Sequence, residues 1–303
     1  MYLLTGANGF IGSYLCERMA REGWPVLATG RGTCRLPVEK WPGVQYHELD
    51  FTDPYAVHDI SAKFRPTAFI HCGAMGKPDE CEENQWEAHR INVEGTINLA
   101  LQAAELNAYF LFLSTDFVFD GKRGMYREDE ALQPVNFYGR TKAEAEAAVA
   151  ELAGPYGIVR TVLVYGAPQS GRTNLLSVVN DKLSGGLPYR VVDDQFRTPT
   201  YVEDLVKGMV EMLRQRAQGI YHLSGAEMMS PYDMAVKMAR INGLDTSLIQ
   251  RVPTSELKHP APRPMRTGLD ISKARLSLGF QPCSFEQGIA AMNSLYAGGK
   301  SQE

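Results

Sequence analysis

The sequence predicts an α/β protein with a doubly wound parallel sheet and a smaller C-terminal lobe. First, short and continuously apolar segments alternate with amphipathic helices up to about residue 165, a pattern typical of parallel strands covered on both faces. Second, a glycine-rich turn joins the first apolar segment to the first helical one. Third, the alternation loosens in the second half of the chain, which predicts a smaller, interrupted lobe there.

The first half supplies six expected strands and the helices between them. Residues 1–6 form an apolar strand that ends in glycine, and residues 10–24 place apolar side chains at helical spacing on one side. The later strands are runs rich in β-branched and aromatic residues, and the later helices repeat the helical spacing. They are expected as strands over 25–31 and 44–53, a helix over 56–63, a strand over 67–75, a helix over 86–107, a strand over 108–119, a helix over 136–153 and a strand over 156–166.

The second half supplies fewer clear elements. A helix is expected to start at Thr200 or Tyr201, and a strand follows over 219–225. Another helix begins after Ser230, whose hydroxyl can serve as N-cap, with a proline in the first turn. Residues 259–270 are rich in proline and are expected to be irregular.

Composition and charge exclude several classes of protein. Hydrophobic residues make up 44% of the 303 residues and the net charge is −4, with no Lys/Arg run of the kind that a duplex-binding face needs. The five cysteines are scattered without a C-x-x-C pair, which argues against disulfides or a zinc site and favours a reducing cytoplasm. No apolar run is long enough to span a bilayer, and the N-terminus is not expected to be a signal peptide.

The turn after the first strand reads "TGANGFIG", with Gly6, Gly9 and Gly12 spaced three apart. Gly6 permits a tight turn, Gly9 lets a pyrophosphate approach the backbone, and Gly12 lets the helix pack close to the strand. The N-terminus of the following helix offers free N–H groups to the phosphates. The motif therefore predicts a Rossmann-type dinucleotide site, against the alternative of an ordinary glycine-rich turn.

The ends of the second and third strands indicate which cofactor is bound. Arg31 follows the second strand, with Arg35 close behind and no acidic residue. An arginine there suits a 2′-phosphate, so NADP is expected, with NAD as the alternative; Arg31 could instead be a solvated loop residue. Asp50 ends the third strand, where it could meet the adenine edge or serve as a helix-capping residue.

Candidate catalytic residues follow the fifth strand. This strand ends in "LSTDFVFDG", which places Ser114, Thr115 and Asp116 at its carboxyl end, beside the expected cofactor. The next helix begins with "YGRTKAEAE", in which Tyr138 and Lys142 are four residues apart and share one face. Either residue alone is unremarkable on a helix surface, whereas the glycine turn, the hydroxyl pair and Y-x-x-x-K in this order form a specific combination.

Taken together, these stretches resemble an extended short-chain dehydrogenase/reductase, and within that superfamily the dTDP-4-dehydrorhamnose reductases. The resemblance runs through nearly the whole chain, and "STDFVFDG" and "RPMRTGLD" carry the subfamily. The other matching stretches are "GANGFIG", "INVEGTINLA", "YGRTKAEAE", "RTVLVYG", "TPTYVEDL" and "YHLSG".

The resemblance implies a role for each catalytic residue. Tyr138 would donate a proton to the alkoxide that forms when hydride reaches a ketone. Lys142 would hold the nicotinamide ribose and lower the pKa of the tyrosine. Thr115, rather than Ser114, would hydrogen-bond the carbonyl oxygen, so Thr115→Val is expected to reduce activity less than Tyr138→Phe.

The resemblance also implies two sets of binding residues. Some relatives use Mg²⁺ at a dimer contact, but this sequence shows no clear carboxylate cluster, so no metal site is expected. The expected cofactor contacts are Gly6, Asn8, Gly9, Phe10, Ile11, Gly12, Arg31, Asp50, Phe51, Cys72, Gly73, Ala74 and Asn92, together with Tyr138 and Lys142. The expected substrate contacts are Lys77, Asp116, Phe117, Arg263 and Arg266, of which the two arginines would close over the nucleotide. Phe117 and Leu163 depart from the family pattern, which commonly has Tyr and Trp there, and this leaves the sugar open.

The implied activity is NADPH-dependent reduction of a nucleotide-activated 4-keto-6-deoxysugar, with dTDP-4-dehydro-L-rhamnose expected to give dTDP-L-rhamnose. Residues 1–165 would bind the dinucleotide, with 200–224 packing back onto them, while 166–199 and 225–303 would form the substrate-binding lobe. Two alternatives stay open: a sugar-nucleotide epimerase or dehydratase, and a non-catalytic subunit resembling the regulatory subunit of methionine adenosyltransferase. The expected partner is a nucleotide sugar, without nucleic acid or membrane, and a homodimer is left open.

Overall fold

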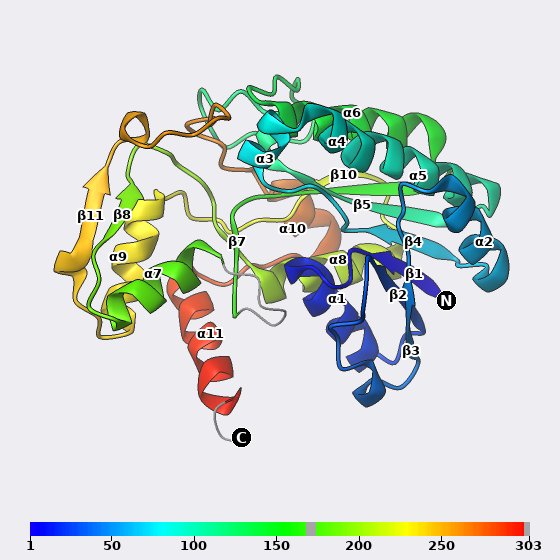
Figure 1. Ribbon diagram of the computed structural model, residues 1–303, viewed down its shortest axis with the longest axis horizontal. Helices are drawn as coiled ribbons and strands as arrows, with labels where there is room; N and C mark the ends of the chain where they lie inside the picture. Colours follow the sequence, from blue (N-terminus) through cyan, green and yellow to red (C-terminus); the bar gives the residue numbers. More distant parts are fainter. Residues whose placement is uncertain (168–173, 300–303) are drawn as a thin grey trace.

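The structure is a computed structural model, and it describes residues 1–167 and 174–299. Within these residues the centre of the protein is a parallel sheet of seven strands (Figure 1). In sheet order the strands are β10 (Gly219–His222), β6 (Tyr156–Thr161), β5 (Tyr109–Thr115), β4 (Ala68–His71), β1 (Tyr2–Thr5), β2 (Val26–Gly30) and β3 (Val44–Glu48). The strand order reverses at β1, which pairs with both β2 and β4, so a ligand crevice is expected at their carboxyl ends.

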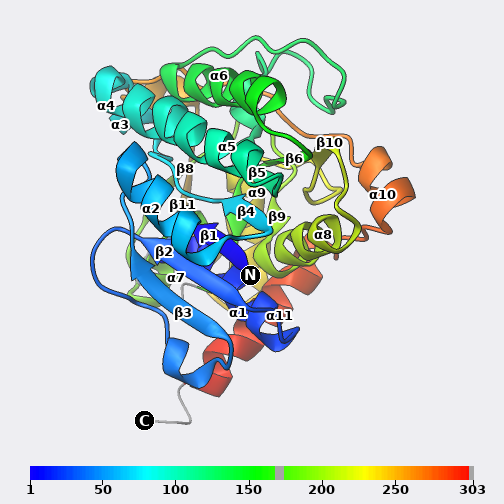
Figure 2. The same ribbon diagram turned by 90° about the vertical axis from the view of Figure 1, so that its right-hand side faces the viewer.

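Helices cover both faces of this sheet, as Figure 2 shows. One face carries α1 (Phe10–Arg21) and α8 (Val202–Gln215), and the other carries α2 (Pro54–Phe64), α5 (Gly95–Glu105) and α6 (Phe137–Leu152). Neighbouring strand residues point to opposite layers: Leu4 packs in the core beneath α1 and α8, and Leu3 packs in the core beneath the other three helices. This arrangement confirms the predicted doubly wound fold.

The helix expected over 86–107 is divided into three parts. The chain forms α4 (Gln85–His89), then a π-helical turn over Arg90–Glu94, and then α5. The amide of Asn92, inside this turn, accepts a hydrogen bond from the Met75 backbone at 2.8 Å and donates one to the Thr141 hydroxyl at 3.0 Å. The π-helical turn directs the Asn92 side chain inward. A uniform helical periodicity did not predict the break, because this turn contains more residues than an α-helical one.

The strand expected over 156–166 is also divided. Its first part is β6, and the short β7 (Val164–Tyr165) leaves the large sheet to pair with β9 (Thr200–Tyr201). Leu163 stands at the division with φ of 40°, in the left-handed region that a leucine rarely adopts. The helix expected to start at Thr200 or Tyr201 is α8, which starts at Val202, directly after β9.

The remaining elements lie mostly in a second group beside the sheet (Figure 1). Ser230, the expected cap of the helix over Pro231–Ile241, accepts a hydrogen bond from the Asp233 amide at 3.1 Å. The helix over Ser272–Leu278 packs against β10 and α8 rather than in the lobe. Residues 168–173 and 300–303 of the expected lobe lie outside the described residues. The further elements are α3 (Pro78–Glu83), α7 (Leu175–Ser184), β8 (Tyr189–Val192), α9 (Pro231–Ile241), β11 (Ile249–Val252), α10 (Ser272–Leu278), α11 (Phe285–Gly299) and 3₁₀ turns over Val38–Lys40, Asp116–Val118, Thr246–Leu248 and Thr254–Glu256.

None of the helices in the described part of the chain is both long enough and apolar enough to cross a membrane.

Candidate active site

A cavity of about 900 Å³ opens at the carboxyl ends of the central strands. It brings together residues from the glycine turn, from the loop after β4, from the end of β5 and from the start of α6. The predicted site residues that line it are Gly9, Phe10, Ile11, Gly12, Arg31, Cys72, Ala74, Lys77, Thr115, Asp116, Phe117, Tyr138 and Lys142. The predicted site residues that do not line it are Gly6, Asn8, Asp50, Phe51, Gly73, Asn92, Arg263 and Arg266.

The glycine turn has the close approaches that its spacing predicts. Gly6 has φ of +70°, and a Cβ placed there would lie 2.6 Å from the Gly73 amide nitrogen. A Cβ on Gly12 would lie 2.2 Å from the Gly6 carbonyl oxygen, so the start of α1 can only pack this closely on glycine. No side chain caps α1 and no acid stands in its first turn. Its first N–H groups are therefore free for an anion, which fits the diphosphate of a dinucleotide.

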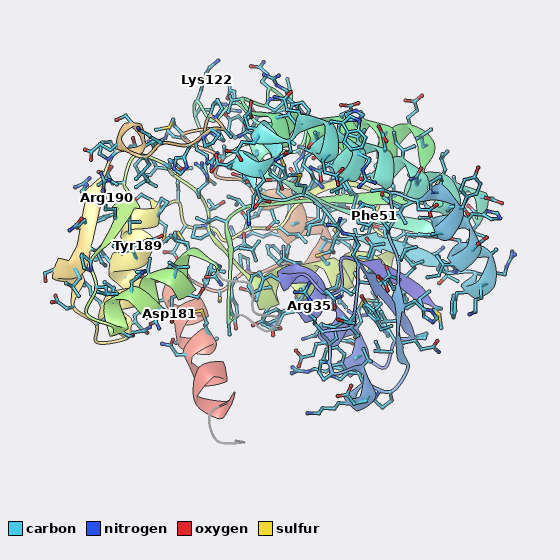
Figure 3. The ribbon with its side chains drawn as sticks, viewed as in Figure 1. Arg35, Phe51, Lys122, Asp181, Tyr189 and Arg190 are labelled. Atoms are coloured by element: carbon cyan, nitrogen blue, oxygen red, sulfur yellow. The ribbon has the colours of Figure 1, made fainter. Side chains whose placement is uncertain are left out.

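The predicted cofactor residue Asn8 does not line the cavity but bonds to the loop that follows β2. The side chain of Asn8 donates hydrogen bonds to the Thr33 carbonyl at 3.0 Å and to the Tyr46 hydroxyl at 2.9 Å, and it accepts one from the Arg35 amide at 3.0 Å. Arg35 and Phe51, both labelled in Figure 3, belong to the loops that follow β2 and β3. Asn8 therefore fixes the loop that carries Arg31.

Phe51 and Asp50 occupy the turn after β3. A Cβ on Gly73 or on Gly95 would lie 2.5 Å from the Phe51 ring, so this ring packs where side chains are absent. The Asp50 carboxylate accepts hydrogen bonds from the Thr52 amide at 3.0 Å and from its hydroxyl at 2.7 Å. Burial acts to raise the pKa of Asp50, but these hydrogen bonds outweigh it and the pKa is lowered. Asp50 is thus engaged in a local turn with Thr52, while Asp53 is the residue that caps α2.

The end of β5 meets one face of α6. The Lys142 ammonium donates a hydrogen bond to the Leu113 carbonyl at 2.8 Å, and the next residue, Ser114, donates from its hydroxyl to the Glu146 carboxylate at 2.5 Å. Lys142 and Glu146 are one helical turn apart and Tyr138 is one turn earlier, so consecutive residues of β5 meet successive turns of α6. This pairing explains why the tyrosine and lysine face the cavity.

The pKa values of the Tyr138 and Lys142 side chains both follow from burial. Burial raises the pKa of Tyr138, while a hydrogen bond with Thr115 acts in the opposite direction. Burial lowers the pKa of Lys142 to about 7, and the nearby Glu146 opposes this change. The resemblance implied that Lys142 would lower the pKa of the tyrosine. Here the ammonium donates to the Leu113 carbonyl, and the raised pKa of Tyr138 keeps its phenol protonated at neutral pH.

Lys142→Met is expected to stabilise the protein by about 2 kcal/mol at pH 6, because one pKa unit corresponds to about 1.4 kcal/mol and the lost bond to Leu113 offsets part of the gain. The folded pKa of Lys142 lies below its unfolded value near 10.4. The unfolded chain therefore binds more protons between these two values, and the gain should fade as pH rises from 7 to 10. Urea unfolding across this range measures it.

The exposed Lys182 supplies the matched control. Lys182→Met should leave the free energy of unfolding within about 0.5 kcal/mol of the parent at every pH. A Lys142→Met protein whose stability relative to the parent is independent of pH would show that Lys142 is not a strained buried cation.

The predicted substrate residues fall into two groups. Phe117 lines the cavity with its ring 5.8 Å from the Tyr138 ring, edge to face, and Lys77 lies at the rim, paired with Glu80 at 2.5 Å. The two C-terminal arginines lie elsewhere. Arg263 pairs with Asp79 at 2.6 Å, and Arg266 lies 4.4 Å above the Phe196 ring. In this structure the two arginines therefore do not close over the cavity.

Several residues of the site were missed by the sequence argument. Arg197 is 4% exposed and its guanidinium lies 3.6 Å from the Asp116 carboxylate. It directly precedes the "TPTYVEDL" stretch, so its position was visible, but nothing local indicated its partner. Glu146 could have been found from its position two helical turns after Tyr138. Ser114 and Leu163, which the sequence had singled out, also line the cavity. The lining residues that were not predicted are Met75, Gly76, Pro78, Glu80, Glu87, Ile91, Leu113, Thr161 and Val164.

A search of residues 1–167 and 174–299 finds no group of three or more His, Cys, Asp and Glu side chains placed to hold a metal ion.

Comparison with known proteins gives consistent results along the whole chain. A family model described as the RmlD substrate binding domain matches residues 1–297. The chain is 33% identical over 294 residues to methionine adenosyltransferase 2 subunit beta of Xenopus tropicalis. The aligned region covers 95% of this chain and 85% of that protein.

Two solved structures are similar in both sequence and shape. A dTDP-4-dehydrorhamnose reductase of Clostridium acetobutylicum is 29% identical with a TM-score of 0.87, covering 98% of this chain and 99% of that one. A dTDP-4-dehydrorhamnose reductase of Bacillus anthracis, crystallised with NADP, is 29% identical with a TM-score of 0.85, covering 96% and 97%.

These matches confirm the fold and the resemblance predicted from the sequence. They also bear out the predicted class, an NAD(P)-dependent oxidoreductase, because the glycine turn, the tyrosine and the lysine of that class line one cavity here. The chain belongs to the RmlD substrate binding domain family.

Proposed function

We propose that this protein uses NADPH to reduce a nucleotide-activated 4-keto-6-deoxysugar, with dTDP-4-dehydro-L-rhamnose as substrate and dTDP-L-rhamnose as product. One observation carries the proposal: Thr115, Tyr138 and Lys142 line the same cavity as the glycine turn that fits a diphosphate. The similarity to dTDP-4-dehydrorhamnose reductases supports the sugar, although their names describe those proteins.

The chemistry assigned to the chain is a proton transfer to a ketone oxygen. A bound nicotinamide dinucleotide supplies the hydride when present. Tyr138, protonated because burial raises its pKa, donates to the ketone oxygen as negative charge develops there. Lys142 stands one helical turn away and holds positive charge beside the phenolate that remains. We assign residues 1–165 and 200–224 to the dinucleotide, and 166–199 and 225–303 to the sugar nucleotide.

Arg31 supports NADP over NAD in this proposal. It lines the cavity, and its positive charge reaches Asp50 and Glu87 on either side. Arg31→Glu is expected to raise the KM for NADPH about tenfold, equivalent to about 1.4 kcal/mol, and to leave the KM for NADH unchanged or lower. Initial rates with both cofactors measure this change. Arg240→Glu, an exposed site on α9, is the control, and an equal effect of both variants would remove Arg31 from the cofactor site.

The sugar end of the cavity is more apolar than the family pattern expects. Phe117 and Leu163 both line it, where a tyrosine and a tryptophan are common in the reductases. These side chains offer no hydrogen bond to a sugar hydroxyl, so they favour a deoxygenated sugar carbon beside them.

Oxidation of NADPH in the presence of a panel of nucleotide keto-sugars tests the function. A reductase consumes one equivalent of NADPH for each equivalent of sugar, whereas an epimerase or dehydratase recycles its cofactor and shows no net consumption. The proposal fails if no keto-sugar oxidises NADPH while the protein binds the dinucleotide.

A second candidate is a non-catalytic partner subunit. It is favoured by the 33% identity to methionine adenosyltransferase 2 subunit beta, a level above that of the two solved reductases. The Thr115, Tyr138 and Lys142 set supports the enzyme instead, because a binding module has no physical need for all three. Stable complex formation with a methionine adenosyltransferase, without turnover of any keto-sugar, would favour the subunit.

A further inference from the structure

Asp116 lines the cavity, and its carboxylate is engaged in a buried network of hydrogen bonds. The side chain is 3% exposed, and the Thr115 hydroxyl donates to its Oδ1 at 3.1 Å. The Thr267 hydroxyl donates to Oδ2, and Arg197 Nε lies 3.6 Å from the same oxygen. Both carboxylate oxygens therefore have partners within the protein, although Asp116 was expected to contact substrate.

The guanidinium of Arg197 is held in place by backbone groups. Its Nη1 donates to the Phe196 carbonyl at 2.9 Å and to the Met265 carbonyl at 3.3 Å, and its Nη2 donates to the Pro264 carbonyl at 2.6 Å. Carbonyls satisfy the hydrogen-bonding capacity of the cation without neutralising its charge. Asp116 is the carboxylate that pairs with it among the described residues.

This arrangement determines what the Thr115 hydroxyl can do. A threonine has one hydroxyl proton, and a carboxylate can only accept, so the proton of Thr115 points to Asp116. The Phe117 amide donates to the Thr115 oxygen at 3.3 Å. The remaining lone pair of that oxygen can accept from the phenol of Tyr138, which lines the same cavity. A developing alkoxide is the stronger acceptor and would draw the phenol proton away from Thr115.

We propose that Arg197 and Asp116 form a positioning pair: Arg197 keeps Asp116 ionised, and the carboxylate fixes the Thr115 hydroxyl so that its oxygen orients the Tyr138 phenol. Thr267 is the second hydroxyl on the carboxylate, and it belongs to the proline-rich segment 259–270. The pair therefore links the end of β5 to two distant segments, so the orientation of the catalytic hydroxyls depends on how both segments pack against it.

The charged groups around Asp116 come from each packed segment. Arg197 faces it from the segment before β9, Tyr138 faces it from α6, and Arg263 acts on Arg197 from the proline-rich segment. Burial raises the pKa of Asp116, and Arg197 is the strongest influence that lowers it. Loss of the Arg197 cation should therefore raise the pKa of Asp116 further.

The first test measures thermal unfolding of the wild type, Arg197→Met, Asp116→Asn and the double variant between pH 5 and 8. In Arg197→Met the folded Asp116 has a raised pKa, so the folded state binds a proton that the unfolded state, with a pKa near 3.9, has released. Stability relative to wild type should therefore fall as pH rises, and this slope should vanish in the double variant. The proposal is overturned if the stability of Arg197→Met relative to wild type is independent of pH, or if its slope with pH persists in the double variant.

Two further variants guard against simple misfolding. Arg197→Lys keeps the positive charge and is expected to follow the wild type with pH, whereas a slope equal to that of Arg197→Met would refute the charge argument. Thr267→Val removes one hydrogen bond without removing a charge. Its stability relative to wild type should also fall as pH rises, but by less than that of Arg197→Met. A Thr267→Val protein whose stability relative to wild type is independent of pH would contradict the role of the Thr267 hydroxyl in keeping Asp116 ionised.

The second test rests on the proposed reductase activity. The kcat of Arg197→Met should fall about tenfold per pH unit below the raised pKa of Asp116 and approach the wild-type value above it, with KM for NADPH unchanged. A constant ratio to wild type across pH would overturn the positioning role. If the wild type itself shows no turnover, the reductase proposal fails, and the unfolding measurements still decide whether the pair exists.

Discussion

Tyr138→Phe is expected to lower kcat for ketone reduction about 10³-fold, within the range that general acid catalysis contributes. The ring of Tyr138 lies edge to face with Phe117, so phenylalanine fills the same space and only the hydroxyl is lost. KM for NADPH should stay unchanged, because Arg31 and the glycine turn are not altered. Steady-state rates at saturating NADPH measure the loss.

Thr115→Val provides the graded comparison for this prediction. It removes the hydroxyl that orients Tyr138 and leaves the proton donor in place, so its loss of kcat should be smaller. Equal losses in the two variants would contradict separate roles. A Tyr138→Phe protein that retains more than about a tenth of wild-type kcat would show that another group donates the proton.

Glu146→Leu is expected to lower the free energy of unfolding by about 3–5 kcal/mol, the typical result of removing one partner of a buried ion pair. Arg160 and Glu146 are 2% and 4% exposed in their side chains, and they pair at 2.6 Å. The variant leaves the Arg160 cation buried beside His222 without a counter-charge. Urea unfolding measures the change.

The double variant Glu146→Leu/Arg160→Met is the sharper control. Removing both charges should recover at least half of the loss, because the largest part arises from the unpaired cation. Arg127→Met, at an exposed pair with Asp129, should cost less than about 1 kcal/mol. A double variant less stable than Glu146→Leu would show that the unpaired Arg160 cation is not the main cause of the loss.

Local patterns in the sequence predicted the elements whose residues interact at short separation. The spacing of Gly6, Gly9 and Gly12 predicted the turn. A Cβ on Gly9 or on Gly12 would meet the Gly6 carbonyl oxygen, a contact between the first strand and its following helix, whereas a Cβ on Gly6 would meet the backbone of Gly73 after β4. The four-residue step from Tyr138 to Lys142 predicted a shared face because helical geometry fixes it. Alternating apolar segments predicted the doubly wound sheet for the same reason.

Elements that depend on distant contacts were predicted less well. The π-helical turn at Arg90–Glu94 follows from Asn92 bonding to the loop after β4, a contact that helical periodicity does not report. The division of β6 from β7 follows from pairing with β9, far along the chain. The ion pair between Arg263 and Asp79 on α3 joins residues 184 positions apart, so nothing local in the sequence indicated it.

The sequence by itself determined the fold, the family and the candidate chemical groups, because these depend on spacing within single elements and on residue type. The tertiary structure alone decided the environment of those groups. It buried Lys142 deeply enough to lower its pKa to about 7, and it brought Arg197 to Asp116. Burial and charge pairing between distant segments arise only when the chain is packed, and they determine which protons the active site holds.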